Sequence, residues 1–316
     1  MLAVYSLVLS RWSLGVAIAL GLVLSSCVAP PPTGESMDLS GENVALIDPE
    51  TAANEQAFES LKITILPDSS SGDRAIKIAE LKTYLTETLG IPVEIDIATD
   101  YDNAVERLVS GISNMAYLAP LTYIQARAQD PTIEPLVAPI DGRTGRPWYT
   151  STIVSTIDIK TLEDLRGKRF GFVNEASTSG FLVPNHEFKK MGINPTLDFA
   201  EVRYGGAHDD NIQLLLKGEV EAIAINQGTY RANLDSGVLD PTKYHLIWES
   251  EPITNAPVAI SGNIPPDIKL QLQKALVHAP PGLIGISVSE SVGYTIVQDA
   301  DYEFVRELYS DIEPQN

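Results

Sequence analysis

Three consecutive hydroxyl side chains, Ser177, Thr178 and Ser179, stand directly before Gly180. A strand-forming run at 169–173 precedes them and a helix-forming run follows, so the pattern predicts a turn from a strand into a helix. At a helix start, hydroxyl donors and free backbone N–H groups lie at the positive end of the helix dipole. The segment therefore predicts a site for a tetrahedral oxyanion that needs no basic residue. The alternative interpretation is an ordinary Ser/Thr helix cap.

Two further strand-to-helix junctions carry polar side chains. In the run 204–209, two glycines permit a tight turn that presents His208 and Asp209 at a helix start. In the run 117–123, Tyr123 falls in the first helical turn, and we expect its hydroxyl to reach a cleft. The plainer interpretations are that Asp209 is an N-cap, that His208 is a solvated loop residue and that Tyr123 belongs to the core.

The elements that must position these side chains alternate between strand and helix. Such alternation predicts a parallel sheet covered by helices on both faces, with ligands at the carboxyl ends of the strands. The pattern restarts after Trp148, which predicts two lobes, and a tail that returns to the first lobe would leave a hinge with a cleft. The predicted strands are 61–67, 93–98, 115–118, 169–173, 199–204, 221–225 and 245–248, and the predicted helices are 74–89, 100–108, 181–190, 209–217, 266–276 and 302–311.

The first residues of the chain have the pattern of an export signal. An apolar run at 12–26 follows Arg11 and ends in Leu-Ser-Ser-Cys, which resembles the bacterial lipobox. We therefore expect a lipoprotein signal peptide over residues 1–26 and a lipid anchor on Cys27. The alternative is an uncleaved short anchor with an incidental cysteine. Because Cys27 is the chain's single cysteine, an internal disulfide, a CxxC redox pair and a structural zinc site are excluded.

The charge of the chain excludes one large class of partners. Asp and Glu number 42 against 22 Lys and Arg, a formal charge of -20, and such a surface does not bind nucleic acid non-specifically. It is typical of a soluble monomer. Residues 27–60 hold three consecutive prolines and seven acidic residues with no basic one, which predicts a disordered tether. The body that follows is therefore less acidic than the total indicates.

Taken together, the motifs resemble one known family, the substrate-binding proteins of phosphate, phosphite and phosphonate ABC transporters. The resemblance extends from about Leu61 to Leu308, and its motifs keep their order and spacing. It implies a two-lobed α/β fold, the type II periplasmic binding protein, with a ligand cleft at the hinge. In these terms residues 61–145 begin lobe 1, 146–248 form lobe 2 and 249–316 return to lobe 1. The motifs lie at 98–111, 116–126, 161–184, 192–195, 204–223 and 299–308.

The resemblance also implies roles for the residues named above. The ligand is a phosphorus oxyanion whose oxygens bind Ser177, Thr178 and Ser179, while Tyr123 donates from the opposite lobe. His208 and Asp209 complete the pocket. The implied function is extracytoplasmic capture of phosphite, phosphonate or phosphate by a membrane-anchored lipoprotein that delivers it to an ABC permease. No catalytic residue, cofactor or metal site is expected.

Asp209 permits a further expectation about specificity. A carboxylate in an anion pocket repels its ligand unless the ligand offers it a hydrogen-bond donor, such as the P–OH of protonated phosphate or phosphite or the ammonium of an aminophosphonate. Sulfate at neutral pH has neither group, so we expect strong discrimination against sulfate. Three other functions remain open from sequence: a ligand sensor for a membrane receptor, a cleft that binds another small anion, and a hydrolase with Ser177 or Ser179 as nucleophile and His208 as base. The G-x-S-x-G elbow of such hydrolases is missing from the sequence.

Overall fold

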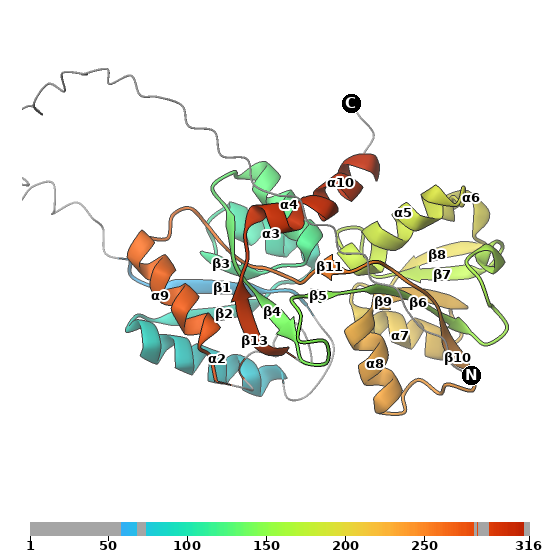
Figure 1. The fold of residues 1–316 in the computed structure, drawn as a ribbon, viewed down its shortest axis with the longest axis horizontal. Coiled ribbons are helices and arrows are strands. Elements are labelled where there is room, and N and C mark those ends of the chain that lie inside the picture. The colour runs from blue at the N-terminus through green and yellow to red at the C-terminus, as the bar shows by residue number, and fades with distance from the viewer. Residues whose placement is uncertain (1–57, 68–73, 281–282, 284–290, 313–316) are drawn as a thin grey trace, which may run out of the picture. The chain divides into compact units, whose positions relative to one another are not determined.

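The computed structural model describes residues 58–67, 74–280, 283 and 291–312 (Figure 1). The predicted signal peptide, Cys27 and most of the predicted tether lie outside the described residues. Phe58, which the composition assigned to the tether, packs against the core of the first lobe, so the folded body already includes it. Within the described residues, the helices lack the length and apolar composition that a membrane crossing requires.

The first lobe is built on a six-stranded sheet with the strand order β13-β4-β12-β3-β1-β2. Helices α2 and α9 bury leucines against one face, and α3, α4 and α10 pack against the other. Asp100 caps α3 by accepting a hydrogen bond from the Asn103 N–H, as predicted. The strands are β1 (Leu61–Ile65), β2 (Val93–Ile97), β3 (Met115–Tyr117), β4 (Glu134–Asp141), β12 (Val258–Ile260) and β13 (Ser291–Ile296). The helices are α2 (Arg74–Leu89), α3 (Tyr101–Val109), α4 (Pro120–Gln129), α9 (Pro266–Val277) and α10 (Glu303–Ile312).

The second lobe holds a five-stranded sheet with the order β10-β6-β9-β7-β8. A cluster of phenylalanines joins β7 to α5, and apolar side chains of α7 and α8 pack against the other face. The strands are β6 (Ser151–Thr156), β7 (Arg169–Phe172), β8 (Glu201–Tyr204), β9 (Ala222–Asn226) and β10 (Tyr244–Glu249). The helices are α5 (Val183–Lys190), α6 (Pro195–Asp198), α7 (His208–Leu216) and α8 (Gln227–Asp235).

Two crossing segments join the lobes. β5 (Trp148–Tyr149) leads into the second lobe and β11 (Ile253–Thr254) leads out of it, and the two strands pair antiparallel (Figure 1). After β11 the chain returns to the first sheet as β12 and β13. Leu182 and Val183 of the second lobe are buried in the same cluster as Leu121 of α4, so the start of α5 is fixed against the first lobe.

The prediction of parallel sheets holds only for the three strands at one end of each sheet. β2, β1 and β3 are parallel, as are β8, β7 and β9, but β12 pairs antiparallel with both β3 and β4. The returning chain enters the first sheet in the opposite direction, which a strand-helix alternation cannot reveal. β4 escaped prediction because Pro135 and Pro139, residues that central strands rarely contain, lie within it.

Candidate functional site

The hydroxyl segment forms the predicted turn between β7 and α5, in a conformation that buries it. Ser177 is the N-cap of a π-helical turn, Thr178–Leu182, which continues into α5, and its Oγ accepts a hydrogen bond from the Gly180 N–H at 3.1 Å. The Gly180 carbonyl in turn accepts from the Val173 N–H. Ser177, Thr178 and Ser179 are at most 2% exposed. Single π-helical turns next to α-helices are frequent at functional sites.

Thr178, the middle one of the three hydroxyl residues, links the two lobes by a hydrogen bond. Thr178 Oγ1 accepts the backbone N–H of Leu121, in the first turn of α4, at 2.8 Å. The hydroxyl of Tyr149, on crossing strand β5, lies beside the side chains of Thr178 and Ser179. Burial raises the pKa of Tyr149 to about 12, so its hydroxyl remains protonated at neutral pH. The segment 177–180 therefore contacts both the first lobe and the hinge.

The second motif places His208 and Asp209 at the start of α7. Gly206 adopts a φ of +89°, and a Cβ at Gly205 would lie 2.9 Å from the Asn211 nitrogen, so both glycines are required for the turn. The Asn226 N–H donates to His208 Nδ1 at 3.3 Å, which leaves Nε2 as the protonated nitrogen of a neutral imidazole. Asn233 Nδ2 donates to Asp209 Oδ1 at 3.3 Å, and this bond orients the carboxylate.

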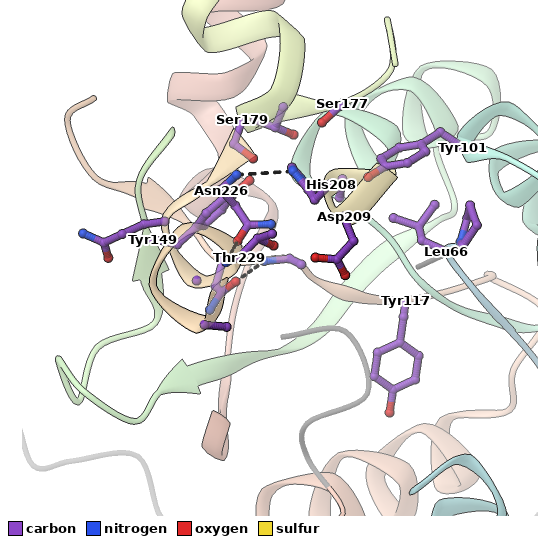
Figure 2. A pocket seen from close by; sticks show the side chains of 18 of the residues that line it. Leu66, Tyr101, Tyr117, Tyr149, Ser177, Ser179, His208, Asp209, Asn226 and Thr229 are labelled. Atoms are coloured by element: carbon purple, nitrogen blue, oxygen red, sulfur yellow. Dashed lines mark hydrogen bonds between the residues drawn. The ribbon is translucent and has the colours of Figure 1, made fainter. Parts of the chain in front are cut away.

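A cavity of about 440 Å³ unites these features at the junction of the lobes. Figure 2 shows Ser177, Ser179, His208 and Asp209 around one space. Five of the six predicted pocket residues line the cavity: Ser177, Thr178, Ser179, His208 and Asp209. The first lobe contributes, among others, Leu66, Arg74, Tyr101, Tyr117, Asp141 and Asn255. Hydroxyls, backbone N–H groups and an imidazole N–H thus face a carboxylate, an arrangement suited to a protonated oxyanion.

The structure places the sixth predicted residue, Tyr123, differently from the sequence expectation. Its side chain is fully buried and does not line the cavity. The hydroxyl donates to Asp299 Oδ1 at 2.6 Å, and the ring packs against Tyr302. Burial and the neighbouring carboxylate raise the pKa of Tyr123 far above its usual range. Tyr123 therefore ties α4 to the 3-10 turn Asp299–Tyr302, which precedes α10.

We expect Tyr123→Phe to lower stability without changing ligand affinity. The change removes one hydrogen bond to a carboxylate, worth about 1.5–3 kcal/mol, while Asp299 keeps its contacts with Arg127 and Arg306. Thermal unfolding and calorimetric titration measure the two effects. Tyr149→Phe is the matched comparison, because that hydroxyl contacts the segment 177–180. A clear loss of affinity in Tyr123→Phe alone would restore the predicted role.

Sequence reasoning missed several cavity residues. Tyr101 packs against Val173 and Ala176 across the junction of the lobes, and Tyr149 comes from a two-residue strand. Arg74 is the first residue of α2. Tyr101 follows the correctly predicted cap Asp100 and lies in motif 98–111 of the family resemblance. Its place in this motif could have indicated that Tyr101 lines the cavity. Neither Tyr149 nor Arg74 lies in a local pattern that marks a site.

Similarity to known proteins identifies the family. The profile of the family "ABC transporter, phosphonate, periplasmic substrate-binding protein" matches residues 63–303. The chain belongs to this family. Substrate-binding proteins of this kind act outside the cytoplasm, bind phosphonate ligands and serve an ABC transporter, so the family is one of binding proteins and not of enzymes.

Individual relatives agree with the assignment to this phosphonate-binding family. A phosphate-import protein, PhnD, of Mycolicibacterium smegmatis is 25% identical over 282 residues, which cover 82% of this chain and 88% of that protein. A probable phosphite-binding protein, PhnD1, of Prochlorococcus marinus is 25% identical over 60% of this chain and 65% of its own length. The structure of PhnD1 with methylphosphonate superposes with a TM-score of 0.72 at 20% identity, over 80% of this chain and 98% of that one. This superposition confirms the predicted two-lobed α/β fold.

Proposed function

We propose that this protein captures a protonated phosphorus oxyanion, namely phosphite, phosphate or a phosphonate, and delivers it to an ABC importer. The observation that carries the proposal is the buried segment 177–180 at the start of α5, facing His208 and Asp209 across one cavity. In the proposed complex, Ser177 and Ser179 hydroxyls and helix N–H groups bind the ligand oxygens. His208 Nε2–H donates to a further oxygen, and Asp209 accepts the ligand's P–OH.

Thr178 has a second role in this proposal. Its Oγ1 accepts the Leu121 N–H and so holds the segment against α4, while its own O–H can still donate to a ligand oxygen. Closure of the cleft would then retain a contact that already links the lobes. A ligand that favours the closed state by several kcal/mol is sufficient to shift such a two-state equilibrium.

The membrane anchor is part of the proposal and rests on sequence alone. A cysteine directly after an apolar run of signal-peptide length is the expected site of lipid attachment, and Cys27 is that residue. The acidic, proline-containing residues that follow favour a solvated tether between anchor and body. These features support a lipoprotein that is held beside its permease, and the net charge of -20 favours a monomer.

Calorimetric titration with phosphate, phosphite, methylphosphonate and 2-aminoethylphosphonate tests the function. We expect at least one of them to bind with a 1:1 stoichiometry and to raise the unfolding temperature, because a ligand that binds only the folded state stabilises it. If none of the four binds, the proposed function is wrong. If one of them binds but importer genes are absent from the genomic neighbourhood, transport is not the function. The protein would then present its ligand to a membrane receptor as a sensor.

The Asp209 carboxylate is expected to exclude sulfate. We expect the wild type to bind the best phosphorus oxyanion at least about a hundredfold more tightly than sulfate. The reason is that sulfate at neutral pH carries no O–H that could donate a hydrogen bond to the Asp209 carboxylate. Asp209→Asn removes the charge and supplies an N–H donor, so the preference is expected to fall below about tenfold. Asp210→Asn, at the next and exposed position of α7, is the matched control. Equal binding of sulfate and phosphorus oxyanions by the wild type would refute the role of Asp209.

A further inference from the structure

An apolar cluster beside the cavity contains side chains of both lobes. Tyr101, the first residue of α3 in the first lobe, forms one buried cluster with Val173 and Ala176 of the second lobe. Leu66 and Ala119, which come after strands β1 and β3, pack against this cluster from the first lobe. Tyr101 is 4% exposed, and Val173 is fully buried. Because apolar surface of both lobes is removed from water here, the cluster stabilises the arrangement in which the lobes meet.

Val173 joins the two turns that carry the predicted ligand-binding side chains. Its N–H donates to the carbonyl of Gly180, in the hydroxyl segment, at 3.1 Å. Its carbonyl accepts the N–H of Gly206, in the turn before α7, at 2.7 Å. Ala176 stands directly before Ser177, so the second-lobe side of the cluster continues into the hydroxyl segment. A displacement of Val173 would therefore move both turns relative to the cavity.

The Tyr101 ring is held in place from the first lobe. Asp100 caps α3 by accepting the N–H of Asn103 at 2.7 Å, which anchors the turn that begins with Tyr101. Tyr101 lines the cavity, and Figure 2 shows it beside Leu66 at one side of that space. A tyrosine side chain has two rotatable bonds, so little conformational entropy is lost when its ring is fixed between two surfaces. Such a ring is suited to transmit the position of the first lobe to the two turns.

We propose that Tyr101 is a positioning residue that couples closure of the lobes to retention of the ligand. With the lobes together, its ring packs in the cluster with Val173 and holds the turns 177–180 and 205–209 in their binding geometry. Separation of the lobes exposes the apolar surface of the cluster to water, which disfavours the open state. The role belongs to the ring and requires no contact between Tyr101 and the ligand. The inference rests on the proposed function, because the ligand retained is the oxyanion proposed there.

Rates of ligand association and release in four proteins test the proposal. The proteins are the wild type, Tyr101→Ala, Tyr101→Phe and the control Tyr84→Ala, and the probes are phosphate, phosphite, methylphosphonate and 2-aminoethylphosphonate. Stopped-flow tryptophan fluorescence measures the rates, since Trp148 lies on the crossing strand β5 and is expected to report movement of the lobes. We expect Tyr101→Ala to release its ligand at least about tenfold faster than the wild type, with association changed less than about threefold. Tyr101→Phe keeps the ring and is expected to stay within about threefold of the wild type in both rates.

The control and a double-variant cycle separate positioning from general stability. Tyr84 is a partly buried tyrosine of α2 that packs against the first-lobe core and donates to the carbonyl of Ala275 at 2.8 Å, and it does not line the cavity. Loss of stability is expected in both alanine variants, whereas faster release is expected only in Tyr101→Ala. Val173→Ala and its combination with Tyr101→Ala complete the cycle. Because both side chains belong to one cluster, we expect the double variant to release ligand no more than about threefold faster than the faster single variant.

Four results would overturn the inference while the wild type still binds and the proposed function stands. Unchanged release in Tyr101→Ala shows that the cluster does not retain the ligand. Equal acceleration in Tyr101→Phe assigns the role to the hydroxyl, and equal acceleration in Tyr84→Ala assigns it to general stability. Multiplied effects in the double variant mean that Tyr101 acts independently of Val173. If the wild type binds none of the four probes, both proposals fail. Tyr101→Leu, which keeps an apolar side chain without the ring, takes the place of Tyr101→Ala in the same comparisons if that variant does not fold.

Discussion

Gly180→Ala is expected to reduce oxyanion affinity by about a hundredfold or more, because small displacements of binding groups have effects of this size. A Cβ at Gly180 would lie 2.4 Å from Val173 Cγ2 and 2.9 Å from Ser177 Oγ, both far inside contact distance. The turn can accept the methyl group only by moving away from β7. That movement breaks the bond from the Gly180 N–H to Ser177 Oγ and displaces the hydroxyls from the cavity.

Calorimetric titration with the best phosphorus oxyanion measures the loss, and thermal unfolding shows whether the variant is folded. Gly293→Ala is the matched control, since its Cβ would meet only Ile140 Cδ1 at 3.8 Å. Wild-type affinity in a folded Gly180→Ala protein would show that the segment 177–180 does not hold the ligand.

Asn211→Ala is expected to destabilise the second lobe strongly. The fully buried Asn211 side chain donates from Nδ2 to the carbonyls of Gly171 and Ala224, both at 2.9 Å, and so holds α7 against β7 and β9. Leaving two buried carbonyls without this donor costs about 2–5 kcal/mol. For a domain of this size the unfolding temperature should fall by roughly 5–15 °C.

The same change should weaken ligand binding, because Asn211 lies one turn after His208 on α7. Differential scanning calorimetry gives the stability effect, and titration at low temperature gives the affinity of the folded fraction. Asn263→Ala, at an exposed loop position of the first lobe, is the control. A shift no larger than that of the control would contradict the positioning role of Asn211.

Local patterns predicted two segments of the second lobe that line the cavity, 177–179 and 208–209. The strand, the hydroxyls, Gly180 and the following helix are contiguous in sequence, and their geometry follows from short-range hydrogen bonds. The same holds for the turn before His208, where two glycines adopt a conformation that residues with a side chain do not fit. Arg74 and Tyr149 could not be found in this way, because one begins a helix and the other lies on a two-residue strand.

Tyr123 shows where local reasoning fails. Its position in the first turn of α4 was correctly predicted, but the periodicity of a helix does not say which neighbour each face contacts. The partner of its hydroxyl is Asp299, 176 residues away in the chain. Only the return of the C-terminal segment to the first lobe brings that carboxylate to α4 and turns Tyr123 away from the cavity.

The sequence by itself determined the fold class, the family resemblance and the turn that presents the hydroxyl residues 177–179, because each depends on residues that are neighbours in the chain. The tertiary structure decided which side chains share the cavity, since the crossing strands β5 and β11 bring two separately folded sheets together. It also decided the charge inside the cavity. The acidic total of -20 describes the whole chain, whereas among the described residues that line the cavity the one lysine or arginine is the buried Arg74.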